Sequence, residues 1–283
     1  MMSTSLVSVT ELQQHLFDAD WCVVDCRHDL MDVELGRRQY AQRHVPGAQF
    51  AHVDDDLSGV RTGTNGRHPL PPREEMAARF RAWGINNDTQ IVAYDASGGQ
   101  FAVRLWWLAR WLGHAKVALL DGGWQQWLAD TNWSSVEPPE RPPGRFAAGE
   151  SLERTVDAGQ LQAQLGNAEA LLVDARAAER YEGRVEPIDP VAGHIPGAIN
   201  RFWQDNLADG RFKSPAQLRA EFERLLAGRA PAQLIAQCGS GVTACHHLLA
   251  MQIAGLPGAR LYAGSWSEWI ADPSRPVATG ANT

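Results

Sequence analysis

Cysteine is scarce in this chain, and its few positions form no recognised spacing. The 283 residues contain four cysteines, none in a CxxC pair or at the distances that hold a zinc ion. The amino terminus has no basic segment followed by an apolar core, so we expect no secretory signal. A disulfide framework is therefore not predicted, and a reducing cytoplasm is the expected location. No metal site is predicted either.

Charged side chains are missing from residues 230–259. This run is long enough to cross a membrane, but glutamine, serine, histidine, glycine and proline interrupt it. A buried strand, loop and helix explain it better, so we expect no membrane partner. The net charge of −7 speaks against a nucleic-acid-binding protein, yet it does not exclude a small anionic substrate.

The chain repeats itself at the distance of a whole domain. "RHVPGAQF" in the first half matches "GHIPGAIN" in the second, and "LLDGGWQQWLAD" matches "LYAGSWSEWIAD". Asp25 and Asp174 are 149 residues apart, whereas Trp124 and Trp266 are 142 apart, as loop insertions would cause. A period of this size indicates a duplicated domain.

Prolines mark the join between the two copies. Residues 134–150 contain two Pro-Pro pairs, which disfavour helix and sheet and are typical of an extended connector. We therefore predict an N-terminal domain at residues 1–136, a linker at 137–150 and a C-terminal domain at 151–283.

Each copy alternates short apolar runs with helical patterns. Strands alternating with helices predict an α/β fold, in which a mostly parallel sheet carries helices on both faces. Ligands of such sheets bind at the carboxyl ends of the strands. The predicted strands include 22–26, 91–95, 170–175 and 234–238, and the predicted helices include 72–84, 101–112, 214–228 and 243–254.

The segment "CGSGVT", which begins at Cys238, combines a cysteine with a flexible loop at such a strand end. Gly239 and Gly241 permit backbone angles that are closed to other residues. A loop that curls before a helix can direct several N–H groups at one point, and a helix starting near Thr243 adds its positive end. An anion at that point would be stabilised, and the sulfur of Cys238, or a charged group attached to it, is the candidate.

The other cysteines are predicted to be buried and structural, with Cys22 and Cys26 on a strand and Cys245 on a helix. Cys238 is expected to be exposed, because its loop offers little packing. Asp95 occupies the matching position in the first copy and cannot act as a sulfur nucleophile. The first copy is therefore predicted to be inactive as a thiol site.

These motifs resemble the tandem-domain rhodaneses, a family of sulfurtransferases, over nearly the whole chain. The matching segments are "VVDCR", "HVPGA", "YDASGG", "LVDAR", "ERYEG", "GHIPGAIN" and "CGSGVTACH".

The resemblance implies that the C-terminal domain is the active one. Cys238 would take a sulfane sulfur from a small donor, become a persulfide and pass the sulfur to a thiophilic acceptor. Cyanide, a thiol or a thioredoxin-like protein are the expected acceptors, and no cofactor is implied. The outer sulfur would be held by the loop residues Gly239, Gly241, Val242 and Thr243.

The loop and the nearby arginines bear on the choice of donor. In the resembled enzymes, mercaptopyruvate specialists carry "CGSGV", as here, and thiosulfate specialists carry cations in the loop. 3-Mercaptopyruvate is therefore the expected donor, with thiosulfate as the alternative. Arg180 matches the first substrate arginine of the family, but Ile188 stands at or near the place of the second. Arg184 either replaces that arginine or is a solvated loop charge.

The resemblance also implies a Ser–His–Asp relay, which this sequence matches in part. Ser240 and His44 match two members as catalytic residues, and Asp32 or Glu34 lies near the third. Alternatively, Ser240 only forms hydrogen bonds within the loop and His44 only packs. Structural roles are expected for His194, for the pairs Asp25–Arg27 and Asp174–Arg176, and for His246 and His247, which are not expected to bind metal.

A phosphatase and a persulfide carrier are two competing functions, and the sequence counts strongly against the first. Phosphatases with a cysteine loop carry an arginine six residues after the cysteine, but Ala244 stands there in this chain. A carrier that receives persulfide sulfur from a partner protein without turnover would use Cys238 in the same way.

Overall fold

The computed structural model describes residues 5–281, which divide into two compact units. Among the described residues, the first unit takes those up to Gly59, Pro71–Leu152 and Asp209–Arg211, and the second takes Val60–Leu70, Glu153–Ala208 and those from Phe212 onward.

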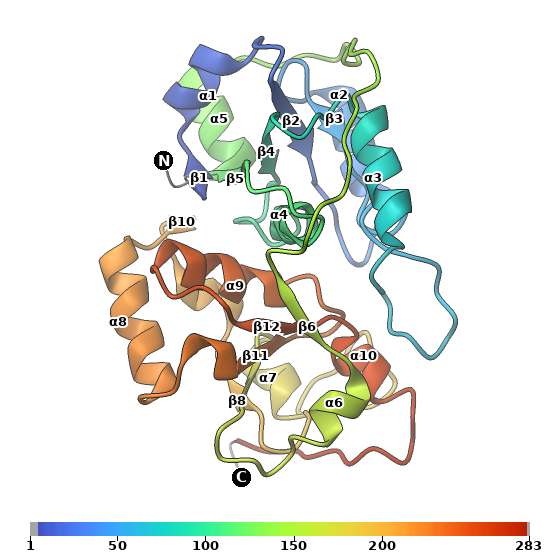
Figure 1. The fold of residues 1–283 in the computed structure, drawn as a ribbon, viewed down its shortest axis with the longest axis vertical. Coiled ribbons are helices and arrows are strands. Elements are labelled where there is room, and N and C mark those ends of the chain that lie inside the picture. The colour runs from blue at the N-terminus through green and yellow to red at the C-terminus, as the bar shows by residue number, and fades with distance from the viewer. Residues whose placement is uncertain (1–4, 282–283) are drawn as a thin grey trace. The chain divides into compact units, whose positions relative to one another are not determined.

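The first unit is built on a parallel sheet with the strand order β1-β5-β4-β2-β3 (Figure 1). Two helices, α1 and α5, lie together on one side of this sheet, and α3 lies on the other. The strands are β1 (Leu6–Val7), β2 (Trp21–Asp25), β3 (Gln49–Phe50), β4 (Gln90–Tyr94) and β5 (Val117–Leu120), and the helices are α1 (Val9–His15), α2 (Leu35–Gln42), α3 (Arg73–Ala82), α4 (Ala102–Trp111) and α5 (Gly123–Thr131).

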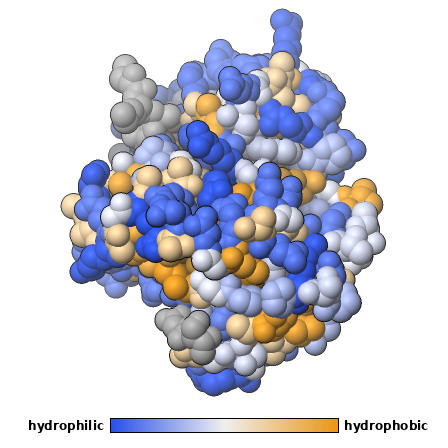
Figure 2. Space-filling model, turned by 60° about the horizontal axis from the view of Figure 1, so that its bottom comes forward, coloured by the Kyte–Doolittle hydropathy of each residue, from blue (hydrophilic) through white to orange (hydrophobic). Residues whose placement is uncertain are grey.

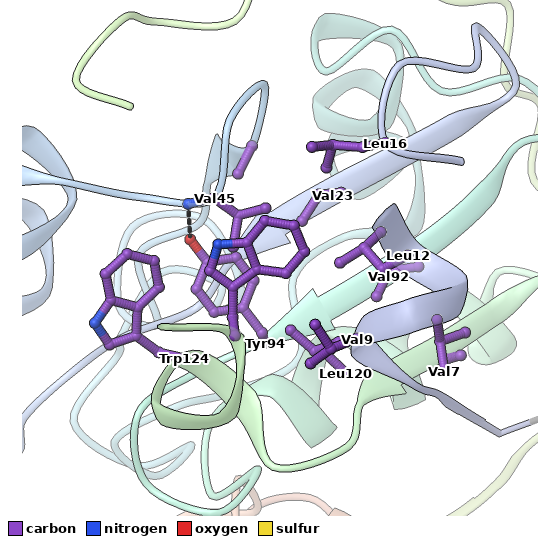
Figure 3. Packing of buried hydrophobic residues seen from close by; sticks show 13 residues of the cluster. Val7, Val9, Leu12, Leu16, Val23, Val45, Val92, Tyr94, Leu120 and Trp124 are labelled. Carbon is purple, nitrogen blue, oxygen red and sulfur yellow. Dashed lines mark hydrogen bonds between the residues drawn. The ribbon is translucent and has the colours of Figure 1, made fainter. Parts of the chain in front are cut away.

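Alternate strand residues supply the core between this sheet and the helices α1 and α5 (Figure 3). Val23 and Val92 on neighbouring strands pack with Leu12 of α1 and Trp124 of α5. The same core holds Tyr94, whose hydroxyl accepts a hydrogen bond from the N–H of Val45 at 3.1 Å. Because side chains alternate across a strand, the intervening residues face the opposite helix layer.

The second unit repeats this architecture, with a parallel sheet in the order β6-β12-β11-β7-β8. Helices α6 and α10 lie on one side of the sheet, and α8 and α9 lie on the other (Figure 1). Its elements are β6 (Arg154–Val156), α6 (Ala158–Gln162), β7 (Leu171–Asp174), α7 (Ala178–Tyr181), β8 (Ile199–Asn200), the 3-10 turns at Trp203–Asn206 and Pro231–Gln233, β9 (Leu207–Ala208), β10 (Arg211–Phe212), α8 (Pro215–Leu226), β11 (Leu234–Gln237), α9 (Ala244–Ile253), β12 (Arg260–Tyr262) and α10 (Ser265–Trp269).

The predicted strands and helices are present, with ends within about two residues of those expected from the sequence. Helix α8 begins as its Ser-Pro start indicates, because the Ser214 side chain accepts a hydrogen bond from the N–H of Gln217. The two sheets have the same strand order, so the internal repeat of the sequence is a repeat of the fold.

One segment does not lie where the sequence placed it. Residues Val60–Leu70 fall within the predicted N-terminal domain, but they pack with the second unit. The N–H of Arg67 donates to the Ser267 hydroxyl at 3.0 Å, and Arg67 also pairs with Asp189. Residues 51–72, between β3 and α3, form neither helix nor strand. The part of this loop from Val60 to Leu70 is therefore free to pack with the second unit.

The surface drawn in Figure 2 is largely hydrophilic, with hydrophobic residues in small groups between the polar ones. Within residues 5–281, no helix combines the length and the apolar character that crossing a membrane requires. The uncharged run at 230–259 instead forms β11 and α9, as predicted, and both are buried.

Candidate active site

Cys238 follows directly after β11, in the middle of the second sheet, and five residues separate it from helix α9. Its side chain is only 1% exposed, so the expectation of an exposed cysteine is wrong. The strand end is covered because the segment from Ser265 holds the loop: Ser265 Oγ accepts from the N–H of Cys238 at 3.1 Å, and Trp266 N–H donates to the Cys238 carbonyl at 3.0 Å. A donor molecule must therefore reach the sulfur through the loops around it.

Two backbone positions give this loop its shape. Gly241 has a φ of +77°, and a Cβ there would lie 2.0 Å from the carbonyl oxygen of Ala263, so only glycine fits. Ser265 has a φ of +54°, which is unusual for a residue with a side chain. Its hydroxyl donates to the Tyr262 carbonyl and accepts from Cys238, and these bonds hold the strained conformation. The first unit has a glycine, Gly123, at the equivalent place.

The matching loop of the first unit shows what such a loop binds. The carboxylate of Asp95 accepts four backbone hydrogen bonds of 2.8–2.9 Å, from the N–H groups of Ser97, Gly99, Phe101 and Ala102. Four convergent amides at the start of a helix are a strong anion site. Asp95 fills that site with its own charge.

The second unit has the same loop with cysteine in place of the aspartate and one residue fewer before the helix. Six residues, 96–101, separate Asp95 from α4, and five, 239–243, separate Cys238 from α9. Thr243, at the start of α9, provides no side-chain cap for the amides of the first turn. The position filled by a carboxylate in the first unit is therefore suited in the second to a negative group attached to Cys238.

Two arginines lie over the beginning of the cysteine loop. A Cβ on Gly239 would lie 3.0 Å from Nη2 of Arg67 and 3.7 Å from both terminal nitrogens of Arg180. Both guanidinium groups pair with the buried carboxylate of Asp189, and Arg180 also pairs with Glu186 at 2.7 Å. Arg180 is thus placed beside the loop that begins at Cys238.

Arg184 does not lie with these arginines. Its side chain is 58% exposed and forms an ion pair with Glu182. Of the two alternatives that the sequence left open for Arg184, the geometry fits the solvated charge. The turn at residues 186–189 lies after Arg184 and places Asp189, not Arg184, beside the other arginines. The Glu186 carboxylate holds this turn by accepting from the N–H groups of both Ile188 and Asp189.

Carboxylate pKa values in this cluster follow burial and charge. Burial raises the pKa of Asp189, and the attraction of Arg67 offsets this only in part. Burial also acts on Glu186, but hydrogen bonds from Arg180 and from the backbone outweigh it, so the pKa of Glu186 is lowered.

A histidine partner for Ser240 is present, but it is His68. Nδ1 of His68 lies 2.7 Å from the Ser240 hydroxyl, and both side chains are buried. The expected partner, His44, contacts other groups. Its Nδ1 lies 2.8 Å from the carbonyl oxygen of Tyr40, and its Nε2 lies 3.0 Å from the carbonyl oxygen of Glu137. The pairing of Ser240 with His44 is therefore not formed.

The two carboxylates that lie in the sequence near the third member of the relay, Asp32 and Glu34, are also engaged elsewhere. Asp32 pairs with Arg38 at 2.5 Å, and Glu34 pairs with Arg37 at 3.2 Å, all on the exposed surface. His44 stacks on Tyr40, with 4.0 Å between ring centres. His194 repeats this arrangement in the second unit, stacking on Tyr181 at 3.8 Å and bonding to the Tyr181 carbonyl. Both histidines therefore have the geometry of packing residues.

The strand-end pairs of aspartate and arginine are structural, as predicted. Arg27 and Arg176 each contact both carboxylate oxygens of their partners, Asp25 and Asp174, at 2.6–3.1 Å. Both pairs are buried, and each arginine also donates to the carbonyl of a following loop.

The remaining cysteines are buried, and two of them are unsuited to nucleophilic chemistry. Cys22, Cys26 and Cys245 are buried, as predicted. Burial raises the pKa of Cys22 to about 12 and raises the pKa of Cys26 well above its ordinary value. Such thiols remain protonated at neutral pH, so they cannot supply a thiolate.

Among residues 5–281, one group of side chains has the spacing of a metal site. Ligand atoms of His28, His52 and Asp54 lie within 4.8 Å of one another. All three belong to the first unit, whereas Cys238 belongs to the second. Nε2 of His52 is within 2.8 Å of the Val33 carbonyl. His246 and His247 are fully buried in α9 and hydrogen-bond to Asn206, which is a packing arrangement.

Arg67, His68 and Asp189 are the site residues that the sequence patterns did not identify. A signal for the first two was present: "GRHPLP" stands in a stretch of about twenty residues with no predicted helix or strand. Irregular segments of that length in a compact domain often carry function. Nothing in the sequence, however, indicated that the segment would pack with the other unit.

Known proteins agree with this fold. A family model described as a rhodanese-like domain matches residues 8–130 and 157–272. A probable 3-mercaptopyruvate sulfurtransferase of Pseudomonas aeruginosa is 51% identical, covering 99% of this chain and 100% of that protein. The thiosulfate sulfurtransferase of Mus musculus is 36% identical over 94% of this chain and 88% of its own length.

A solved structure of a related protein has the same fold over nearly the whole chain. The crystal structure of SseA from Escherichia coli, described with the 3-mercaptopyruvate sulfotransferases, superposes with a TM-score of 0.81 at 32% identity. The match covers 94% of this chain and 100% of that one. The chain therefore belongs to the rhodanese family and is a sulfurtransferase built from two tandem rhodanese domains.

Proposed function

We propose that this protein transfers sulfur from 3-mercaptopyruvate, through a persulfide on Cys238, to a thiophilic acceptor such as cyanide or a thiol. The observation that carries the proposal is the pair of equivalent loops. In one, four amides bind the carboxylate of Asp95, and in the other a cysteine stands at the same strand end. A thioredoxin-like protein is a further candidate for the sulfur acceptor, beside the small molecules.

The first half-reaction forms the persulfide. The thiolate of Cys238 attacks the sulfur of the donor, and the carbon–sulfur bond breaks. The electron pair of that bond leaves with carbon as the enolate of pyruvate, which takes up a proton to become pyruvate. The sulfur stays on Cys238 as an anionic persulfide, and the loop amides stabilise this negative charge.

The second half-reaction regenerates the enzyme. Cyanide or a thiolate attacks the outer sulfur, the sulfur–sulfur bond breaks, and its electron pair returns to Cys238 as the thiolate. With cyanide the product is thiocyanate. Because the donor product leaves before the acceptor reacts, ping-pong kinetics are expected.

Ser240 and His68 are suited to move the proton of the donor thiol. A hydroxyl 2.7 Å from an imidazole can pass a proton to that ring, as general acid–base catalysis requires. The same pair can return the proton to the departing enolate. The arginine beside the loop, Arg180, supports an anionic donor, because its guanidinium can bind a carboxylate in a planar, bidentate way.

The test compares kcat/KM for 3-mercaptopyruvate and thiosulfate, with cyanide as the common acceptor. A large preference for mercaptopyruvate is expected, since the loop residues Gly239 and Ser240 carry no cation for a compact dianion. A preference for thiosulfate would assign this chain to the other donor. Turnover of neither donor would favour a carrier that receives its sulfur from a protein.

Cys238→Ser is expected to abolish both persulfide formation, measured by mass spectrometry of the intact protein, and sulfur transfer. Cys22→Ala is the matched control, because Cys22 is a buried thiol of the first unit and should be dispensable for transfer. Transfer that survives in Cys238→Ser would rule out Cys238 as the sulfur carrier.

A further inference from the structure

The two units differ in the segment that follows the stacked tyrosine of each copy. Tyr40 stacks on His44 in the first unit, and Tyr181 stacks on His194 in the second. Three residues, 41–43, separate the first pair, whereas twelve, 182–193, separate the second. The longer segment carries Glu186, but residues 41–43 contain no acidic side chain. The first unit therefore has no counterpart of the Glu186 carboxylate in this segment.

The absence of that carboxylate changes the contacts of an arginine that the two units share. Arg27 and Arg176 bind the strand-end aspartates of their units in the same way. Nη2 of each also donates to the carbonyl of the residue before the stacked histidine, Arg43 or Gly193. Nη1 of Arg176 then pairs with Glu186 at 3.4 Å. Nη1 of Arg27 forms no hydrogen bond or ion pair with any residue in the range 5–281.

A cavity of about 230 Å³ lies beside Arg27 in the first unit. Arg27 and Arg43 line it, and their guanidinium groups lie over the ring of Trp124, at 4.5 and 5.8 Å from its centre. Gln39 and Gln42 of α2 also line it, and their spacing of three positions puts them on one face of that helix. No acidic side chain belongs to the lining.

The charge of this cavity favours an anion. Asp25 balances the charge of Arg27, whereas Arg43 has no ion pair with another described residue. The charge of Asp95, which lies near the cavity, is already met by four backbone amides. Arg43 also stands where the second unit has Gly193, because both residues give their carbonyl to the shared arginine. Compared with the second unit, this place has gained a cation and lacks a carboxylate.

We infer that the cavity binds a small carboxylate anion, which takes beside Arg27 the place that Glu186 takes beside Arg176. The guanidinium groups of Arg27 and Arg43 supply the charge-assisted donors, and the side-chain amides of Gln39 and Gln42 supply neutral ones. The volume is below the roughly 300–1,000 Å³ of pockets for drug-sized molecules, so a ligand of a few non-hydrogen atoms fits. The inference does not depend on the proposed function, because Cys238 belongs to the other unit.

The test is a titration of the full chain with sodium acetate, followed by NMR at the indole N–H of Trp124. Trp124→Phe identifies that resonance by its absence, and sodium chloride keeps the ionic strength constant. We expect the resonance to move with a dissociation constant on the order of millimolar, as suits a ligand of so few atoms. No movement up to about 100 mM acetate would overturn the site, since such weak binding would have no specificity.

Arg43→Ala should weaken acetate binding by about tenfold or more, because a charged hydrogen-bonding partner is lost. Arg38→Ala is the matched control: it removes the same charge from the same helix, but Arg38 does not line the cavity. Arg180→Ala should also leave the titration at Trp124 unchanged, which separates this site from the cysteine loop. Equal affinity in wild type and Arg43→Ala would contradict the inference.

Gln42→Glu gives a second, independent test, because it places a carboxylate of the chain itself at the cavity, as Glu186 does in the second unit. Acetate should then bind at least about tenfold more weakly, through competition and repulsion. Gln42→Met, which is neutral and of similar size, should lose less than about tenfold. Acetate binding to Gln42→Glu as tight as to wild type would overturn the inference.

Inorganic phosphate at the same ionic strength distinguishes a carboxylate site from a general anion site. Phosphate should bind less tightly than acetate, because a single arginine in the lining lacks an ion pair. Tighter binding of phosphate at Trp124 would contradict the assignment to a carboxylate.

Discussion

Ser240 shows how one hydrogen bond changes the reading of a side chain. In the sequence it is a small polar residue in a flexible loop, for which a local hydrogen bond is explanation enough. In the structure its hydroxyl is buried 2.7 Å from His68, a residue 172 positions earlier in the chain. That contact makes a proton relay testable at the scale of single residues.

The relay predicts an effect that depends on the donor. Mercaptopyruvate carries a thiol proton that must leave, whereas thiosulfate brings no such proton. Ser240→Ala and His68→Gln are therefore expected to lower kcat/KM for mercaptopyruvate by about 100-fold, the lower end of general acid–base effects. The same variants should change thiosulfate turnover far less. Steady-state kinetics with cyanide as acceptor measure both donors.

His44→Gln is the comparison for that experiment. Because the His44 ring contacts the Tyr40 and Glu137 carbonyls, its loss should lower the free energy of unfolding without changing the donor ratio. Equal losses on both donors in His68→Gln would argue against the relay. A change of donor ratio in His44→Gln would return His44 to the role that the sequence suggested.

At the scale of elements, the two strand–loop–helix units differ by the group at the strand end. In the first, the carboxylate of Asp95 accepts hydrogen bonds from four amides at the start of α4. These amides are stabilised by Asp95 and leave no place for another anion. In the second, α9 starts without a side-chain cap and Cys238 replaces the aspartate. The same backbone design thus holds a carboxylate in one copy and a cysteine in the other.

Helix α9 also contains a histidine that resists protonation. His247 is fully buried, and its Nε2 lies 2.8 Å from the Arg201 carbonyl while Nδ1 lies 3.0 Å from the side-chain amide of Asn206. Burial, together with the nearby positive charge of Arg201, lowers the pKa of His247 to about 3 from an ordinary 6.5. The neutral ring is therefore part of the packing of α9.

This pKa shift predicts loss of stability in acid. Below pH 6.5 the unfolded chain binds a proton at His247 that the folded chain does not bind until about pH 3. The contribution is complete above pH 6.5 and falls by roughly 1.4 kcal/mol per pH unit well below it. Urea unfolding between pH 7 and pH 5 should show this decline, and His247→Gln should show a shallower one.

The control for the pH experiment is His15→Gln, which removes a histidine from the exposed side of α1. If His15→Gln flattens the pH dependence as much as His247→Gln does, the slope does not come from the buried ring of α9.

At the scale of the whole molecule, the N-terminal half of the chain contributes residues to the second unit. Segment Val60–Leu70 belongs to that unit and carries both Arg67 and His68. The duplication therefore did not leave two independent copies, because the second unit includes a loop that ends more than eighty residues before Glu153, where the main part of that unit begins.

Gly66 is the position at which this dependence can be tested. Its φ is +81°, and a Cβ there would lie 2.9 Å from the Gly264 carbonyl oxygen and 3.1 Å from Ser267 Oγ. Gly66→Ala should displace the residues that follow it, Arg67 and His68, and lower kcat/KM for mercaptopyruvate. A loss of about tenfold is expected, equivalent to ~1.4 kcal/mol of strain.

Gly63→Ala is matched to this variant. Gly63 has a similar φ of +89°, but a Cβ there would meet nothing within 4 Å. Both variants therefore carry the same backbone cost, and only Gly66→Ala disturbs the contact with Gly264. Equal activity in the two variants would show that the seating of this segment does not matter for sulfur transfer. Thermal unfolding of both checks that the fold is kept.

The sequence by itself determined the features that depend on local pattern. Apolar periodicity, the repeat and the "CGSGVT" segment were sufficient for the α/β fold, the two copies and the place of Cys238 at the end of a strand, because strand ends and helix starts follow from neighbouring residues. Arg180 was indicated only by the resemblance to the rhodanese family. The strand-end pair of Asp174 and Arg176 could be read in the same way, since its members are two positions apart.

Only the tertiary structure decided which distant residues meet at the site. It brought His68 rather than His44 to Ser240 and buried Cys238. It also set Arg67 rather than Arg184 beside the cysteine loop. A loop without periodicity carries no local signal of its destination, and its contacts are fixed by charge pairing and packing across more than a hundred residues of chain.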